Sequence, residues 1–131
     1  MSRFFQSIVF IVCCLQDYCF ANSSDDMDVT AGQQIYTQCT GCHAPAYHRT
    51  GPRHCDILGR RAGSEIEFEF TQAMKDSDII WTKATLDQFL KEPLKMIPGT
   101  SMGFAGISLS RERTQLIAFL ATLTEENTLC R

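Results

Sequence analysis

The sequence predicts an all-α fold with about three main helices, and three observations predict it. Apolar residues recur at helical spacing near the C-terminus, in residues 116–123. Residues 83–91 show the same pattern between a capping threonine and a proline. The one alternating run, residues 65–70, has no second run to pair with, so we expect an extended loop there rather than a strand.

The first main helix is expected over residues 29–39. Asp28 precedes it and can cap it, with the carboxylate at the positive end of the helix dipole. Gly32 and Tyr36 lie one turn apart on a single face. Because a glycine inside a helix costs about 1 kcal/mol relative to alanine, we expect another helix to approach closely at Gly32.

The rest of the chain alternates loops and helices. Residues 44–63 contain repeated Pro and Gly and predict a long irregular loop, which in a compact domain usually wraps something. The remaining helices are expected over residues 71–76, over 83–91 with Thr82 as cap and Pro93 as stop, and from Ser108 or Ser110 to about Leu123, with an apolar stripe at Leu116, Ile117, Leu120 and Leu123.

The length and the N-terminal segment indicate one domain of an exported protein. The 131 residues carry a net charge of −3 and no basic patch, which argues against nucleic-acid binding. Residues 1–21 resemble a secretory signal with cleavage after Ala21, which leaves residues 22–131 as a single domain in the periplasm. The apolar run is too short for a spanning helix of ~20 residues. An uncleaved anchor, or a lipid-modified Cys13 or Cys14, remains an alternative.

The motif Cys39-Thr40-Gly41-Cys42-His43 carries the chemistry. Two thiols three positions apart on a helical turn face the same way, so both can add to the vinyl groups on one edge of a haem. His43 can then bind the iron. Two other interpretations compete: a thioredoxin-like redox pair, which needs a βαβ context, and a zinc site, for which only His48, His54 and Cys55 lie nearby.

The sixth coordination position of such a haem decides the function. Methionine sulfur favours ferrous iron and gives an electron carrier. Spacing alone does not choose among the candidate methionines, although Met102 lies in a loop stiffened by proline, where a ligand is free of helical constraint. The other candidates are Met27, Met74 and Met96.

Cys55 and Cys130 remain once the signal and the haem motif have taken the other five of the seven cysteines. An even remainder in an oxidising compartment is what a single disulfide would leave. Two unrelated thiols, one packed and one in a frayed tail, would leave the same remainder.

The chain resembles the short class I cytochromes c of the mitochondrial and bacterial periplasmic type, from Gly32 to about Leu123. The resemblance rests on ordered motifs: Gly32 to Tyr36 in the first helix, Cys39 to His43, His48 to Pro52, Leu58 to Arg60, Trp81, Ile97 to Met102, and Leu116 to Leu120, whose Leu116 and Phe119 would cross the face of Gly32 and Tyr36.

This resemblance implies the cytochrome c fold, wrapped around one covalent haem c. It implies His43 and Met102 as axial ligands, with the Pro52 carbonyl accepting the other ring proton of His43. His48 would tie loops together, and His54 would likewise be structural. The haem would be attached through Cys39 and Cys42, and its propionates would be held by Arg60, Thr71, Trp81 and Thr100.

Some positions depart from the family pattern. Phe70 and Phe89 stand where many relatives have tyrosines, and Met74 replaces a polar residue, so the pocket is more apolar. The residues beside Met102 are uncharged where mitochondrial relatives carry lysines, and Lys91 and Lys95 are the main candidates for a remaining positive rim.

These features favour a soluble periplasmic electron carrier, not an enzyme, that transfers one electron at a time in a respiratory chain. The alternative is a haem peroxidase or small-ligand sensor with a labile or open sixth position; a small zinc or disulfide protein is a third reading. Redox proteins such as a quinol–cytochrome c reductase and a terminal oxidase or peroxidase would be its partners. We expect a monomer without nucleic acid or firm membrane insertion.

Overall fold

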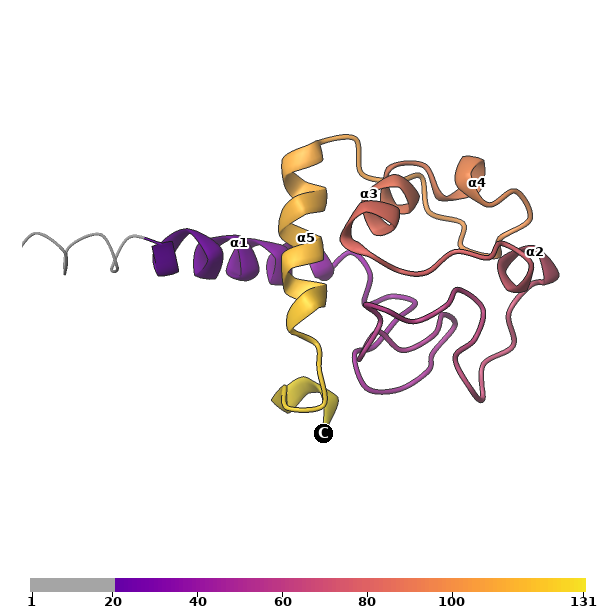
Figure 1. Ribbon diagram of the computed structural model, residues 1–131, viewed down its shortest axis with the longest axis horizontal. Helices are drawn as coiled ribbons and strands as arrows, with labels where there is room; N and C mark the ends of the chain where they lie inside the picture. The colour runs from indigo at the N-terminus through magenta and orange to yellow at the C-terminus, as the bar shows by residue number, and fades with distance from the viewer. Residues whose placement is uncertain (1–20) are drawn as a thin grey trace, which may run out of the picture.

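Two long helices cross to form the frame of the protein, and residues 37–109, which connect them, lie to one side of the crossing (Figure 1). They are α1 (Ala21–Tyr36) and α5 (Ser110–Thr122). The computed structural model describes residues 21–131, with side chains from Ser24 onward. The predicted secretory signal therefore lies outside the described residues, apart from Ala21.

Helix α1 begins earlier than the sequence indicated. Its first described residue is Ala21, and Asp28 lies inside the helix, so the predicted cap at Asp28 is wrong. Residues 21–28 contain neither Pro nor Gly, so nothing stops the helix from extending backward. The Asp28 carboxylate instead accepts a hydrogen bond of 3.0 Å from the Gln115 side chain of α5.

The crossing of α1 and α5 depends on Gly32. A Cβ atom at this position would lie 1.9 Å from the backbone oxygen of Gln115, so the two backbones approach more closely than any side chain allows. One turn later, the rings of Tyr36 and Phe119 pack with centroids 5.1 Å apart. The predicted contact between the two helix faces is confirmed.

Shorter helices surround the frame. Thr82 caps α3 (Lys83–Lys91), as predicted from the sequence. The cap is a reciprocal pair of hydrogen bonds between Thr82 and Thr85. No strand occurs among residues 21–131, and residues 65–70 form a loop. The other elements are α2 (Gln72–Lys75), with Thr71 as its cap, α4 (Pro93–Met96), with Pro93 in its first turn, and the 3₁₀ turn η2 (Thr128–Cys130).

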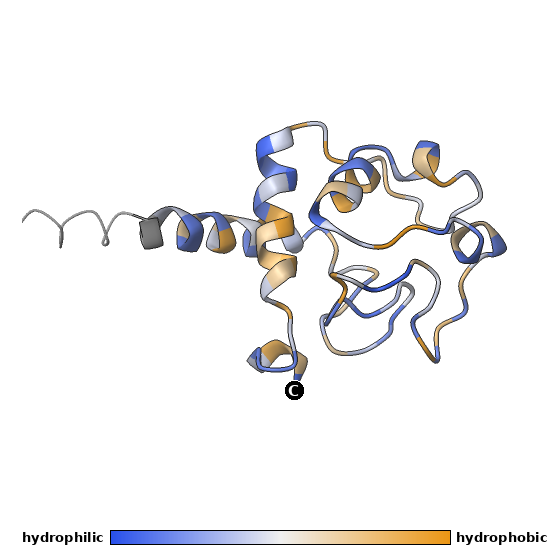
Figure 2. Ribbon diagram, in the orientation of Figure 1, coloured by the Kyte–Doolittle hydropathy of each residue, from blue (hydrophilic) through white to orange (hydrophobic). Residues whose placement is uncertain are grey.

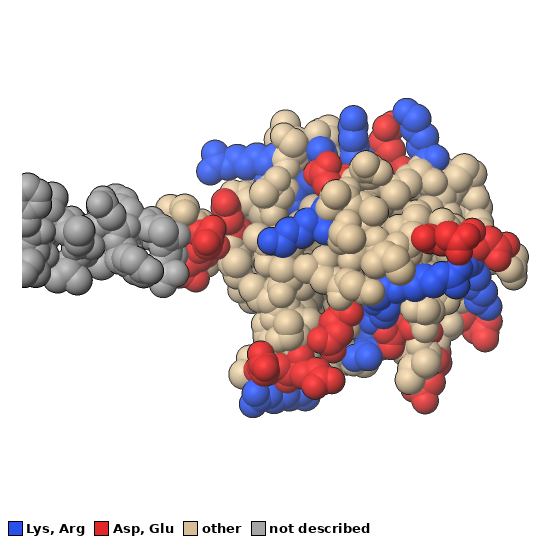
Figure 3. All heavy atoms as spheres, in the orientation of Figure 1, with Lys and Arg blue, Asp and Glu red and all other residues tan. Residues whose placement is uncertain are grey.

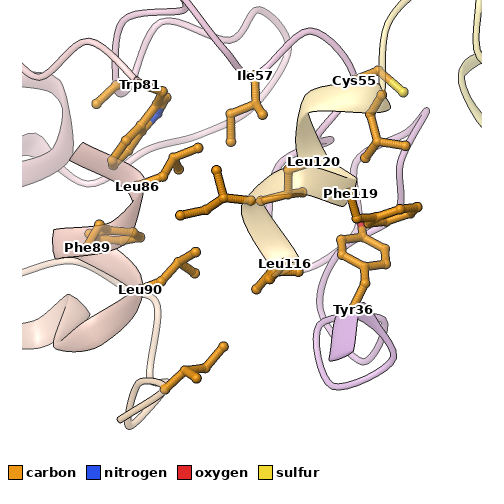
Figure 4. Close-up of a cluster of buried hydrophobic side chains, with 14 of the residues drawn as sticks. Tyr36, Cys55, Ile57, Trp81, Leu86, Phe89, Leu90, Leu116, Phe119 and Leu120 are labelled. Carbon is orange, nitrogen blue, oxygen red and sulfur yellow. The ribbon is translucent and has the colours of Figure 1, made fainter. Parts of the chain in front are cut away.

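The core lies between α3, α5 and the end of α1. Leu116, Leu120 and Leu123 are each at most 4% exposed, which confirms the predicted apolar stripe of α5. Figure 2 shows this apolar half of α5 toward its C-terminal end. In Figure 4, Leu86, Phe89 and Leu90 of α3 lie opposite Leu116 and Leu120 of α5.

A disulfide joins Cys55 to Cys130, which decides between the two readings of these cysteines. It ties the C-terminal turn η2 to the loop that follows the motif from Cys39 to His43. The backbone N–H of Asp56 also donates to the Leu123 carbonyl at 2.8 Å, so the loop and the tail are held at two adjacent points.

We expect Gly32→Ala to lower the free energy of unfolding of the holoprotein by about 1–3 kcal/mol, because the new methyl group meets backbone that cannot move aside. Denaturant titration measures the change. Gly41→Ala is the control, since a Cβ there has no neighbour within 4 Å. Equal destabilisation by both variants would contradict the close-approach explanation.

We expect Cys130→Ser to destabilise the ferric holoprotein by about 2–4 kcal/mol, because the bridge closes a loop of 75 residues. Thermal unfolding under non-reducing conditions measures this. Leu129→Ser, next to the bridge and partly exposed, keeps the disulfide and should change stability much less. Two free thiols in the non-reduced wild-type protein would overturn the assignment.

Candidate haem site

A cavity of about 370 Å³ opens between α3, α5 and the loops on either side of α2. All nine residues that the sequence assigned to a haem site line it: Cys39, Cys42, His43, Pro52, Arg60, Thr71, Trp81, Thr100 and Met102. Most of the remaining wall is apolar. In Figure 4, Trp81, Leu86 and Phe89 lie on one side, and Leu116 and Leu120 lie on the other.

The cysteine motif forms a hydrogen-bonded turn after the end of α1. The backbone N–H groups of Cys42 and His43 both donate to the Cys39 carbonyl, at 3.0 and 2.9 Å. This turn brings both thiols to the cavity. The Cys39 side chain is partly buried while Cys42 is exposed, so the attachment edge lies where the cavity meets solvent.

His43 is held so that one ring nitrogen is free. Its Nδ1 lies 2.7 Å from the Pro52 carbonyl oxygen and donates to it, because a carbonyl can only accept. Burial lowers the pKa of His43, partly offset by this hydrogen bond, so the neutral ring is favoured. Its Nε2 has no hydrogen-bond partner among the described residues. Every fully buried side-chain nitrogen or oxygen in this part of the chain does have a partner, so Nε2 is not fully buried and faces the open space of the cavity.

Glycine makes room for the His43 ring. A Cβ atom at Gly51 would lie 2.3 Å from Cε1 of His43, so only glycine fits there. His54 stacks on the ring, with centroids 4.2 Å apart. The ring plane is therefore fixed by packing and by one hydrogen bond, which is the arrangement found around metal-ligating histidines.

Met102 reaches the cavity from an irregular loop. The Thr100 N–H donates to the Ile97 carbonyl at 3.0 Å, and the Met102 N–H donates to the Thr100 hydroxyl at 3.3 Å. Gly99 supplies a φ of +94°, which favours glycine. Of the other candidate methionines, Met74 also lines the cavity, whereas Met27 is 65% exposed and Met96 does not line it.

Hydrogen-bond donors are grouped at the predicted propionate positions. No described residue accepts from the Trp81 indole N–H, although the residue is only 7% exposed, so the N–H faces the cavity. The Thr71 and Thr100 hydroxyls accept from backbone N–H groups and can still donate. Such donors suit carboxylates at the rim of an otherwise apolar site, so the residues fit a haem.

The two competing interpretations of the motif are not supported. A redox-active cysteine pair needs a lowered thiol pKa, but burial, followed by the neighbouring Cys42, raises the pKa of Cys39 to about 11. In the described part of the chain, no three His, Cys, Asp or Glu side chains gather in a way that could hold a metal ion, which argues against a zinc site.

Two residues of the site region were not assigned to it from the sequence. His54 lines the cavity and hydrogen-bonds through Nδ1 to the Tyr36 hydroxyl at 3.0 Å. Burial lowers its pKa well below the ordinary value, and His43 and Arg60 lower it further, so it stays neutral. Glu65 is buried behind Arg60. No local pattern marks either residue, because both lie in a stretch without regular secondary structure, where no helical or strand period relates them to their partners.

Comparison with known proteins gives relatives along most of the described chain. No protein-family model matches. The chain is 40% identical over 98 residues to a cytochrome c2 of Rhodomicrobium vannielii, covering 72% of this chain and 78% of the relative. It is 41% identical over 98 residues to a cytochrome c of Tetrahymena pyriformis, covering 73% and 89%.

A solved structure gives the same result. The fold is similar to that of cytochrome cH from Methylobacterium extorquens, with a TM-score of 0.70 and 35% identity, over 72% of this chain and 97% of that one. With the motif turn, the free His43 nitrogen and the apolar cavity, these similarities lead to one conclusion. The chain belongs to the class I c-type cytochromes, and its cofactor is covalently attached haem c.

Proposed function

We propose that this electron carrier binds its haem iron through His43 and Met102 and works in the periplasm. The observation that carries the proposal is the shared cavity, which brings both side chains together with Cys39 and Cys42. One imidazole and one thioether are the ligand pair of electron-transferring cytochromes c. Cys39 and Cys42 anchor the group, and Pro52, Arg60, Thr71, Trp81 and Thr100 position it.

The residues that line the cavity would have two separate roles toward the haem. When bound, haem c supplies a one-electron ferric–ferrous couple. The Pro52 carbonyl fixes the His43 ring and makes its free nitrogen a stronger ligand for iron. Phe70, Phe89 and Met74 line the cavity without hydroxyl groups, so this part of the wall offers water little to bind. Such a site exchanges electrons without a substrate pocket or a catalytic base, as expected of an electron-transfer protein rather than an enzyme.

Electrons would enter and leave near the exposed attachment edge. Cys42, Ser101 and Gly103 line the cavity and are exposed, Gly41 next to Cys42 is exposed as well, and none of the four carries a charge. A quinol–cytochrome c reductase is the proposed donor, and a terminal oxidase or peroxidase of a respiratory chain is the proposed acceptor. Export would follow from a cleaved signal at residues 1–21, leaving residues 22–131 as a monomeric domain. No helix among the described residues is long and apolar enough to cross a membrane.

We expect the ferric protein to show the weak far-red absorption band of methionine sulfur on haem iron, and the ferrous protein to be inert to carbon monoxide. Met102→Ala should abolish the band, lower the reduction potential and open the iron to carbon monoxide, because the sulfur ligand is removed. Met96→Ala is the control, since Met96 does not line the cavity. Absence of the band in the wild-type protein, with rapid carbon monoxide binding, would favour the peroxidase or sensor alternative.

We expect the rate constant of electron transfer to partners to depend less on salt than in mitochondrial relatives. Lys91 and Lys95 are exposed, but the Lys95 amine lies 3.3 Å from a Glu92 carboxylate oxygen, which offsets its charge. Figure 3 shows acidic and basic side chains interspersed on the face drawn. Stopped-flow measurements over a series of ionic strengths test this, and a steep fall with added salt would contradict it.

A further inference from the structure

A buried carboxylate links two arginines behind the wall of the haem cavity. The Glu65 side chain is 4% exposed, and its Oε1 accepts from Nε of Arg53 at 2.8 Å. Its Oε2 accepts from Nη1 of Arg60. Arg60 lines the cavity, whereas Glu65 and Arg53 do not. Glu65 therefore lies one layer behind the proposed propionate contact.

Backbone hydrogen bonds hold Arg60 in one orientation. Nη1 also donates to the Cys55 carbonyl at 3.2 Å, and Nη2 donates to the Arg53 carbonyl at 2.9 Å. A guanidinium has five N–H donors, so Nε and one hydrogen of Nη2 remain for a carboxylate in the cavity. The Arg53 carbonyl belongs to the residue after Pro52, so the same guanidinium steadies the segment that orients His43.

The hydrogen-bonded cluster of Arg53, Arg60 and Glu65 places a net positive charge near the cavity. The two arginines and Glu65 together carry one net positive charge, against two without Glu65, and the Asp56 carboxylate also acts on Arg60. Burial lowers the pKa of Arg60 and Glu65 raises it again, as expected when a cation depends on a buried partner. Because the surroundings are partly dehydrated, each charge acts on the cavity more strongly than it would in water.

We propose that Glu65 is a positioning residue that holds Arg60 in place, and that its negative charge lowers the reduction potential of the haem by cancelling one of the two arginine charges. Ferric haem carries one more positive charge than ferrous haem, so a nearby anion favours the ferric form. The proposal rests on the proposed function, because it takes Arg60 as a contact of a bound haem. It assigns a role to a residue outside the cavity lining.

The test is the midpoint potential of purified holoprotein variants, measured by redox titration. Glu65→Gln keeps the shape of the side chain and removes its charge, and should raise the potential. Glu65→Asp keeps the charge and should stay near the wild-type value even if packing suffers. Arg53→Gln removes a positive charge and should shift the potential downward, which gives a second reading if Glu65→Gln yields little holoprotein.

Glu67→Gln is the matched control. It makes the same change of charge two residues away on an exposed side chain, so it should move the potential far less than Glu65→Gln. A Glu65→Gln potential equal to or below that of Glu67→Gln would overturn the inference, as would an upward shift in Arg53→Gln. Wild-type protein without the methionine band would instead fail the proposed function, which keeps the two failures distinguishable.

Discussion

The apolar wall of the cavity is the constraint on which the rest of the structure depends. Leucines and aromatic rings from α3 and α5 face an open volume of about 370 Å³, and such a surface is stable in a small domain only when a large apolar group covers it. The close approach at Gly32 fixes the angle between α1 and α5, and this places the cysteine turn at the edge of that volume. The fold can therefore be understood as a shell around its cofactor.

The shell is chemically divided. Hydrogen-bond donors from Arg60, Thr71, Trp81 and Thr100 gather in loops and at caps, where backbone irregularity leaves polar groups available. The faces of α3 and α5 supply only apolar contacts. A haem has the same division between its charged propionates and its apolar ring, so the cavity matches the whole group and not the iron alone.

What could be predicted from the sequence was local. The Thr82 cap needs only the next three residues, and the motif from Cys39 to His43 is contiguous, so both were found. The assignment of Asp28 as a cap was wrong because α1 continues backward through residues 21–28, and the contact that Asp28 makes instead, with Gln115, spans 87 residues. Glu65 was missed because it lies with Arg53 and Arg60 in a stretch without regular secondary structure, where no helical or strand period relates the three residues. The remaining site residues were assigned from the resemblance to a family, and that resemblance did not assign Glu65.

Because the chain needs both a disulfide and two free thiols, the order in which its cysteines react during assembly matters. Four thiols of the described chain can form six different single disulfides, and only the one between Cys55 and Cys130 leaves both Cys39 and Cys42 available for haem. Residues three apart meet far more often in an unfolded chain than residues 75 apart. Spontaneous oxidation would therefore trap the motif first. The order of assembly, and not only the final pairing, has to be imposed on this chain, with the haem thiols protected until the tail has emerged and found its partner.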